Sequence, residues 1–332
     1  DKDSLKTLRQ ELKQSASQVP NLVSYEARLC FSRFYRPAPL PEAGYPVARL
    51  CNRQGSLSLF GAARSYFYRF RRSSDAAQAR RKQICIAMPR VLNMWSTAPF
   101  WRTYFETLGI PNSGIVFSDE SSEALFRRGG RYGSTDPCFP SKIAQAHIHN
   151  ILFEKHTERH PVHILYFPTV THTPSFVEQS IDSACCPVVA GTPNVIKAAF
   201  TKEVDFFAQR NIRYIDDAVT MNEPELLTQQ LYQTWGDALE ITGDENRFAV
   251  NEAWRALHLF DEKLQTKGRE VLDRLEADGK LGILLLARPY HHDPGVGHEI
   301  AEEFQAHGYP ILSIRSIPKH KAWLHRFFAR DL

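Results

Sequence analysis

The stretch "QICIAMPRVLNMWSTAPFWRTYFETLGIPNSGIVFS", residues 83–118, contains the pattern that decides the fold. Its first part, "QICIAM", is short and apolar, as in a buried strand. The part "APFWRTYFETLG" has the apolar spacing of a helix, and Gly109 is suited to end that helix. The part "GIVFS" then returns to a strand. This order of strand, helix and strand predicts a βαβ unit with parallel strands.

The same alternation continues along the chain. Further strands are expected at "VHILYFP", "CPVVA" and "IRYID", and further helices at "SSEALFRRGG" and after Cys138. Residues 223–277 have helical apolar spacing with no strand between them. The alternation restarts at "LGILLLARP", an apolar strand expected to be parallel and buried on both faces, followed by a helix at "GHEIAEEFQAHG" and a strand at "YPILSI".

These changes of pattern predict an α/β fold with a doubly wound parallel sheet domain, a helical connector and a second, truncated α/β unit. In chain order we expect a connector and N-terminal segment at 1–82, an α/β domain with candidate cluster loops at 83–220, a helical segment at 221–278 and a partial second α/β domain at 279–332.

Composition limits the class of protein. The chain has 332 residues and a formal net charge of +4, from 41 basic and 37 acidic residues. No apolar run approaches the roughly 20 residues of a membrane helix, and the start, "DKDSLKTLRQELKQ", has no signal-peptide core. Six cysteines are too few for a disulfide scaffold in so long a chain. We therefore expect a cytoplasmic protein with reduced thiols and no membrane contact.

Basic residues gather in "FYRFRRSSDAAQARRK", from Phe67 to Lys82. Its aromatic residues lie at one end only, and no nucleic-acid-binding motif surrounds it. We interpret this stretch as a solvated linker and expect no nucleic-acid partner.

Three stretches are expected beyond the carboxyl ends of strands, where open α/β sheets bind ligands. They are "STDPCFPSK", "YFPTVTHTPS" and "ARPYHHDPGVGHE". In the first, Cys138 stands before Pro140 at the start of a helix, where free N–H groups and the helix dipole would stabilise a thiolate. A packed free thiol is the alternative interpretation.

Five ordered blocks resemble a known family. They are "IAMPRVLNMWSTAPFWRTYFETLG", "SDESSEALFRRG", "STDPCFPSKIAQAHIHNIL", "CCPVV" and "ARPYHHDPGVGHEIAEEF". In this order they are similar to the large fused activators of the 2-hydroxyacyl-CoA dehydratase system, over roughly residue 83 to the end. In that family an ATPase part of the actin-like fold comes first, and a region similar to the iron–sulfur dehydratase subunits follows. This chain contains no ATPase motif, so it resembles the second region only.

The resemblance implies an iron–sulfur cluster, [4Fe–4S] or larger, used for low-potential electron transfer. Cys138 matches the first ligand and Cys186 a later one, while Cys185 is a further candidate. The pattern departs at "FPT", where Thr169 stands in place of a cysteine. A hydroxyl is a poor iron–sulfur ligand beside thiolates, so the cluster is expected to be absent or labile in the isolated chain.

Other candidate residues follow the last apolar strand. By the resemblance, Arg288 and His291 would position a cofactor, and Gly295 and Gly297 precede a helix start that could hold a phosphate of coenzyme A or of a nucleotide. A hydrolytic metal site from the histidines around His291 is an alternative, as is simple turn formation by Asp293, Pro294 and Gly295. His147 and His149 are expected on different faces of one helix.

Three functions follow from these residues. The first is the non-ATPase, iron–sulfur-type redox region of an ATP-dependent acyl-CoA dehydratase activator or a related low-potential reductase. Its partners would be an ATPase domain of the same or another chain, which alone would use ATP, and an acyl-CoA dehydratase or related redox protein. The second is a docking domain without a cluster. The third is a metal-dependent hydrolase. The sequence leaves the acyl-CoA or other substrate and the oligomeric state open.

Overall fold

The computed structural model describes residues 18–50, 65–132, 138–174, 183–319 and 321–326. Cys51, residues 134–137 before Cys138, the start of the chain and its last residues lie outside these ranges. Within the described residues, no helix combines the length and the hydropathy needed to cross a bilayer.

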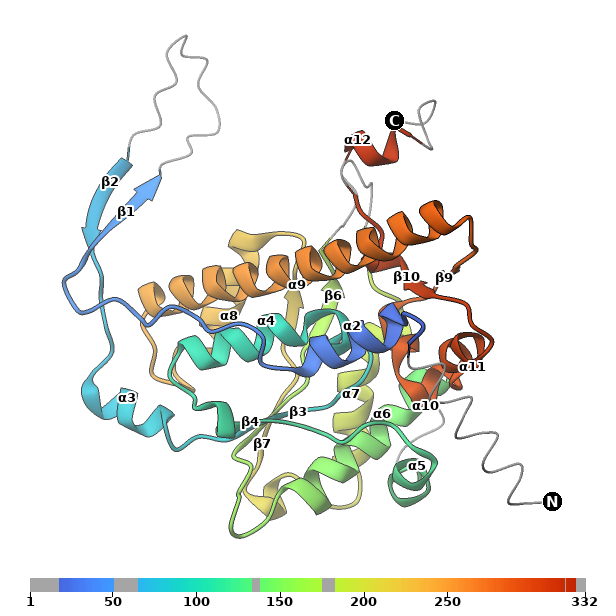
Figure 1. Ribbon diagram of the computed structural model, residues 1–332. Coiled ribbons are helices and arrows are strands. Elements are labelled where there is room, and N and C mark those ends of the chain that lie inside the picture. Colours follow the sequence, from blue (N-terminus) through green and yellow to red (C-terminus); the bar gives the residue numbers. More distant parts are fainter. Residues whose placement is uncertain (1–17, 51–64, 133–137, 175–182, 320, 327–332) are drawn as a thin grey trace.

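A four-stranded parallel sheet lies at the centre, in the order β4-β3-β5-β7 (Figure 1). Its strands are β3 (Ile86–Met88), β4 (Ile115–Phe117), β5 (Ile164–Tyr166) and β7 (Arg213–Ile215). Residues 83–118 form β3, the helix α4 (Met94–Thr107) and β4, with Gly109 in the left-handed conformation after the helix. The predicted βαβ unit is therefore confirmed.

Side-chain alternation in the sheet separates two cores. Ile86 and Met88 of β3 face one core, while Ala87 between them faces the other. In β5, Ile164 and Tyr166 face the first core and Leu165 faces the second. Because a parallel strand covered on both faces is apolar throughout, both faces need helices, and the doubly wound α/β fold is confirmed.

Different helices cover the two faces (Figure 1). On one face lie α4, α8 (Pro224–Trp235) and α9 (Gly243–Asp278). On the other lie α6 (Phe139–Asn150), which continues as a π-helical turn at Ile151–Lys155, and α7 (Pro187–Thr201). The expected strand "CPVVA" is wrong, because these residues form the first turn of α7. Pro187 is tolerated there since the first turn needs no N–H donor.

The remaining elements surround this body. They are the helices α3 (Asp75–Arg81), α5 (Glu123–Gly129) and α12 (Lys321–Leu324), the antiparallel pair β1 (Pro46–Leu50) and β2 (Ser65–Arg69), the parallel pair β6 (Thr169–His172) and β8 (Ala218–Thr220), and short 3₁₀ turns at Asn112–Gly114 and Ala208–Arg210.

The C-terminal unit is a two-stranded parallel sheet, β9 (Ile283–Leu285) with β10 (Ile311–Ser313). Its helical pieces are the 3₁₀ turns η4 (Pro289–His292) and η5 (Ile314–Ser316) and the helices α10 (Pro294–Gly297) and α11 (Ile300–Ala306). The prediction of a parallel β9 is confirmed. Burial on both faces is wrong, because Leu284 and Leu286 are 43% and 72% exposed and no described element covers them.

The helix α2 (Leu22–Phe31) joins the start of the described chain to this C-terminal unit. The Ile311 N–H donates to the Pro20 carbonyl at 2.9 Å, so the segment before α2 pairs with β10. Glu26 of α2 is buried 3.5 Å from His292 Nδ1. Burial opposes the ionisation of Glu26, but His292 and Arg315 together hold its pKa below the ordinary value.

The long helix α9 links the two units. Leu257, Phe260 and Leu264 belong to the same core as α4, so this part of α9 packs on the central sheet. Farther along, a Cβ on Gly268 would lie 1.7 Å from the Ser316 carbonyl oxygen. Only glycine therefore permits η5 to approach α9 so closely. The division into domains stays a prediction.

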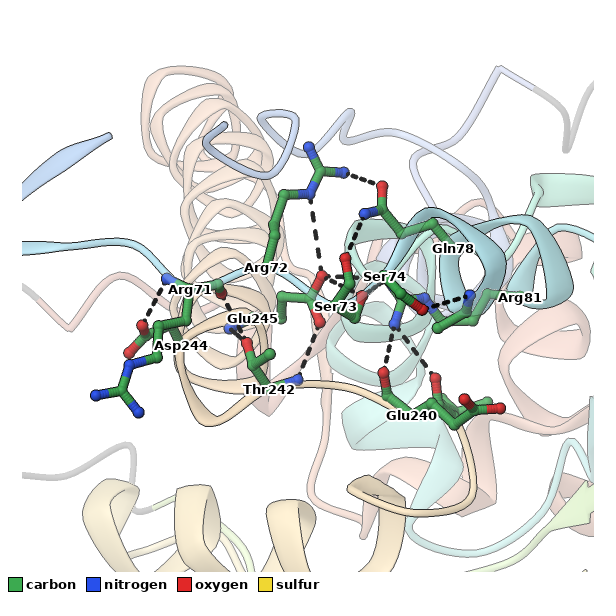
Figure 2. A network of polar contacts seen from close by, with 12 residues as sticks. Arg71, Arg72, Ser73, Ser74, Gln78, Arg81, Glu240, Thr242, Asp244 and Glu245 are labelled. Carbon is green, nitrogen blue, oxygen red and sulfur yellow. Dashed lines mark hydrogen bonds and ion pairs between the residues drawn. The ribbon is translucent and has the colours of Figure 1, made fainter. Parts of the chain in front are cut away.

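A polar network anchors the start of α9 to α3 (Figure 2). Thr242 and Glu245 form a capping box, in which Glu245 accepts from the Thr242 N–H at 3.0 Å. The other carboxylate oxygen of Glu245 accepts from Ser73 at 2.8 Å and from Arg81 at 3.2 Å. Arg81 is 1% exposed, so the interpretation of the basic stretch as a solvated linker is wrong at this residue.

Glu245→Gln tests the importance of this buried ion pair. The change leaves the Arg81 guanidinium buried without its counter-ion, and we expect a loss of about 3 kcal/mol in the free energy of unfolding, measured by urea denaturation. Glu240→Gln is the matched control, because it breaks only the exposed pair of Glu240 with Arg80 and should cost less than about 1 kcal/mol. Equal losses of unfolding free energy in the two variants would show that the buried pair matters no more than the exposed one.

Candidate functional site

Two cysteines stand at the start of neighbouring helices. Cys138 is the N-cap residue of α6 and Cys186 is the N-cap residue of α7. The two helices lead into β5 and β7, which are adjacent parallel strands, so both helices begin at the carboxyl edge of the sheet. The Ser141 and Thr192 hydroxyls lie 2.9 Å apart and join the first turn of α6 to the second turn of α7. The fold thus brings Cys138 and Cys186 to one edge.

The environment of Cys186 favours a thiolate. The backbone N–H groups of Val189 and Val188 face its sulfur and lower the pKa of the thiol, and the charge of Arg288 lowers it further. Unpaired N–H groups at a helix start stabilise negative charge in this way. Cys186 is therefore the more nucleophilic member of the "CC" pair.

Cys185 has the opposite environment. Burial raises the pKa of its thiol, although the Asn93 side chain donates to the sulfur at 3.5 Å and Arg288 adds positive charge. The Cys185 N–H donates to the Thr171 carbonyl at 2.8 Å. This bond places the residue beside β6.

Tyr290 is the common neighbour of the three cysteines. Burial raises the pKa of its hydroxyl, and negative charge on Cys186, Cys138 and Cys185 would raise it further. Arg288 lies close enough to oppose this effect. The C-terminal unit therefore presents an arginine and a tyrosine to the cysteine edge of the central sheet.

Thr169 begins β6 directly after β5. Its N–H donates to the Asp217 carbonyl at 3.1 Å. Its hydroxyl oxygen is buried and has no hydrogen-bond partner among the described residues. A buried unpaired hydroxyl is costly, so this position is polar without a structural need in this chain.

The described donors do not fit a complete iron–sulfur cluster. No group of three or more His, Cys, Asp or Glu side chains in the described ranges is arranged to hold a metal ion. The residue at the position of a third thiolate is Thr169, and Cys185 is hydrogen-bonded to Asn93. Cys138 and Cys186 supply two thiols at the edge, while a [4Fe–4S] cluster needs four ligands.

A buried network ties the C-terminal unit to this edge. Ser121 donates to Asp293 at 2.5 Å, so His147 Nε2 must donate to the Ser121 oxygen at 2.8 Å. His147 Nδ1 then accepts from Ser118, at 2.7 Å. Burial lowers the pKa of His147 to about 3, so the ring is neutral. Burial also raises the pKa of Asp293.

The two glycines of the predicted phosphate site pack against protein. A Cβ on Gly295 would meet the Ser121 Cβ at 2.7 Å, and one on Gly297 would meet the His291 carbonyl oxygen at 2.3 Å. Asp293 caps α10 by accepting from the Gly295 N–H at 2.9 Å, as the turn interpretation expects. Phosphate binding by these glycines stays a prediction.

The histidines do not assemble a hydrolytic centre among the described residues. His292 faces Glu26, and Asp293 accepts from Ser121. His291 lies beside Arg288, and burial lowers its pKa, with the charges of His292 and Arg288 contributing. His149 stacks on Phe153 while His147 joins the buried network, which confirms that the two lie on different faces of α6.

A comparison with protein families identifies the chain. Residues 85–317 match the family described as CoA enzyme activase uncharacterised domain (DUF2229). The chain belongs to this family. Membership of the CoA enzyme activase family supports an activator in general terms and, with it, a partner enzyme. Comparisons with curated proteins and with solved structures found no match.

Sequence reasoning missed two groups at the edge of this activase domain. Tyr290 stands between Arg288 and His291 in the block "ARPYHHDP", where an aromatic residue directly after a strand was a usable signal. Asn93 comes from the loop after β3, and nothing in the sequence relates it to Cys185, which lies 92 residues away.

The neutral His147 predicts a loss of stability in acid. In the unfolded chain the ring takes a proton near pH 6.5, whereas the folded chain resists protonation down to about pH 3. Stability is therefore present above pH 6.5 and falls as the pH drops through this window, by on the order of 3 kcal/mol at pH 4. Urea denaturation at pH 7, 5.5 and 4 measures it.

His147→Gln is the control, because it cannot titrate. The difference in the free energy of unfolding between this variant and the wild type should shrink as the pH falls. Asp293 acts with the opposite sign, since its raised pKa favours the folded state at low pH and this contribution fades as the pH rises. A deficit that stays constant from pH 7 to pH 4 would contradict the assignment of a neutral, buried imidazole.

Proposed function

We propose that the chain is the dehydratase-subunit-like region of an activator of acyl-CoA dehydratases and that the cysteine edge is its working site. In this proposal Cys138 and Cys186 contribute two thiolates toward an iron–sulfur cluster, and a partner domain or protein supplies the missing ligands. The observation that carries the proposal is the arrangement of the two cysteines at adjacent helix starts around Tyr290 and Arg288. Family membership supports the activator role.

Physical chemistry favours this edge for an anionic thiolate centre. Helix starts and an arginine stabilise negative charge, and both are present at Cys186. Cys186 and Tyr290 are partly buried against the apolar core on this face of the sheet. The described residues supply too few ligands for a complete cluster. We therefore propose shared ligation only, and no electron-transfer step within this chain.

A docking region without a cluster is the second candidate. The unpaired, buried hydroxyl of Thr169 favours it, because a position that no longer binds metal is free to change. In this case the edge would contact the dehydratase partner through Arg288 and Tyr290. The two candidates differ in whether the isolated chain retains iron with sulfide after anaerobic reconstitution.

Variants of Cys138 and Thr169 test the proposal. We expect wild-type protein to retain little iron, Thr169→Cys to retain several times more iron and sulfide, and the double variant Thr169→Cys with Cys138→Ser to lose that gain. Iron and acid-labile sulfide are measured after anaerobic reconstitution and desalting, and far-ultraviolet circular dichroism checks that each variant folds.

Two matched controls accompany this experiment. Thr169→Val removes the unpaired hydroxyl without adding a thiol, and should not raise iron retention. Cys85→Ser removes a thiol at the start of β3, at the other end of the strand, and should leave the gain intact. If Thr169→Cys retains no more iron than Thr169→Val, shared ligation at this edge is wrong and the docking candidate stands.

A further inference from the structure

A cavity of about 690 Å³ lies at the start of α9, beside the base of the β1–β2 pair. Arg69 and Arg71, from the end of β2 and the segment after it, line one side. Tyr232 of α8 and the first two residues of α9, Gly243 and Asp244, also line it. Three parts of the chain that are distant in sequence therefore surround one space, which is large enough for a small-molecule ligand.

The backbone that carries the two arginines is held from both sides. The Phe70 N–H donates to the Tyr45 carbonyl at 2.9 Å, and the Arg71 N–H donates to Asp244 Oδ2 at 2.8 Å. Phe70 is 2% exposed and packs against Phe248. Successive side chains of an extended segment point to opposite sides, so the buried Phe70 turns the arginine on either side of it outward. The two guanidinium groups are thus presented from a fixed backbone.

The charge of this cavity is positive. Neither the Arg69 nor the Arg71 guanidinium has an ion-pair or hydrogen-bond partner among the described residues. Figure 2 shows the Arg71 guanidinium outside the polar network, on the side away from α3. Among the described lining residues only Asp244 carries a carboxylate, against two arginines. A Cβ on Gly243 would meet no atom within 4 Å, so the start of α9 is open and its dipole adds positive potential.

We infer that this cavity binds a nucleotide, with its phosphates on Arg69 and Arg71 and its base against Tyr232. Guanidinium groups form paired, charge-assisted hydrogen bonds with phosphate oxygens, and two of them suit a ligand with two or more phosphates. The Tyr232 side chain is 44% exposed, and exposed aromatic rings stack on bases. Coenzyme A and ATP both have this chemistry. The inference concerns a site separate from the cysteine edge and does not rest on the function proposed for that edge.

Isothermal titration calorimetry of the full chain tests the inference with four ligands: coenzyme A, ATP, adenosine and inorganic phosphate. We expect saturable binding of coenzyme A, ATP or both. Adenosine and phosphate should bind at least about tenfold more weakly, because each makes only part of the contacts. If neither nucleotide binds at millimolar concentration, the inference is wrong. If phosphate alone binds as tightly as the nucleotides, the assignment to a nucleotide is wrong.

Variants of the charged residues locate the ligand. Arg69→Gln and Arg71→Gln should each weaken nucleotide binding by about tenfold. Arg80→Gln is the matched control, because Arg80 belongs to the same basic stretch but pairs with Glu240, and it should leave the affinity unchanged. Asp244→Asn keeps an oxygen for the Arg71 N–H but removes the carboxylate charge, so it should tighten binding. A purely structural role of these residues predicts no such gain.

Variants of Tyr232 test the role of the ring. Tyr232→Phe keeps the ring and should keep the preference for nucleotides over inorganic phosphate, whereas Tyr232→Leu should reduce it by about tenfold. Far-ultraviolet circular dichroism checks that each variant folds. Unchanged nucleotide binding in the double variant Arg69→Gln with Arg71→Gln would place the ligand elsewhere and overturn the inference. The test involves neither iron nor cysteine, so its failure would not count against the cysteine edge.

Discussion

Burial of β3 and β5 on both faces is the constraint on which the rest of the structure depends. Ile86, Met88, Ile164 and Tyr166 require cover on one side, and Ala87 and Leu165 require it on the other. Two-sided burial requires helices on both faces. The parallel strands also need connections that cross over the sheet, and these helices supply them. The starts of α6 and α7 then fall at the same edge. The location of Cys138 and Cys186 at one edge of the sheet is thus a consequence of strand burial.

The C-terminal unit completes the edge through contacts distant in sequence. The chain from Ser118 through His147 and Ser121 to Asp293 fixes the loop that carries Arg288 and Tyr290. The pairing of the segment before α2 with β10, and the close approach of η5 to α9 at Gly268, hold the same unit from its other sides. These buried polar contacts therefore help to hold Arg288 and Tyr290 at the cysteine edge.

Local pattern predicted most of the central sheet, because β3, β4, β5 and β7 are short apolar runs between well-marked helices. It failed at "CPVVA", since β-branched residues after a proline also suit a helix start once the helix continues for 15 residues. It failed for the outer face of β9, because burial depends on neighbours that a strand's own sequence does not specify. The cysteine edge could be expected from loop positions, but Asn93 could not, since its contact with Cys185 comes from packing between distant segments.

The central claim is that the sheet edge gathers Cys138 and Cys186 into one site. The most direct measurement uses a variant with Cys51, Cys85 and Cys185 changed to Ser, in which Cys30 stays buried. Under reducing conditions the protein is treated with a short bismaleimide, and the products are mapped by peptide mass spectrometry. The account predicts an intramolecular cross-link between Cys138 and Cys186 as the main product in the folded chain and its loss in urea. Separate single adducts at the two cysteines in the folded chain would contradict it.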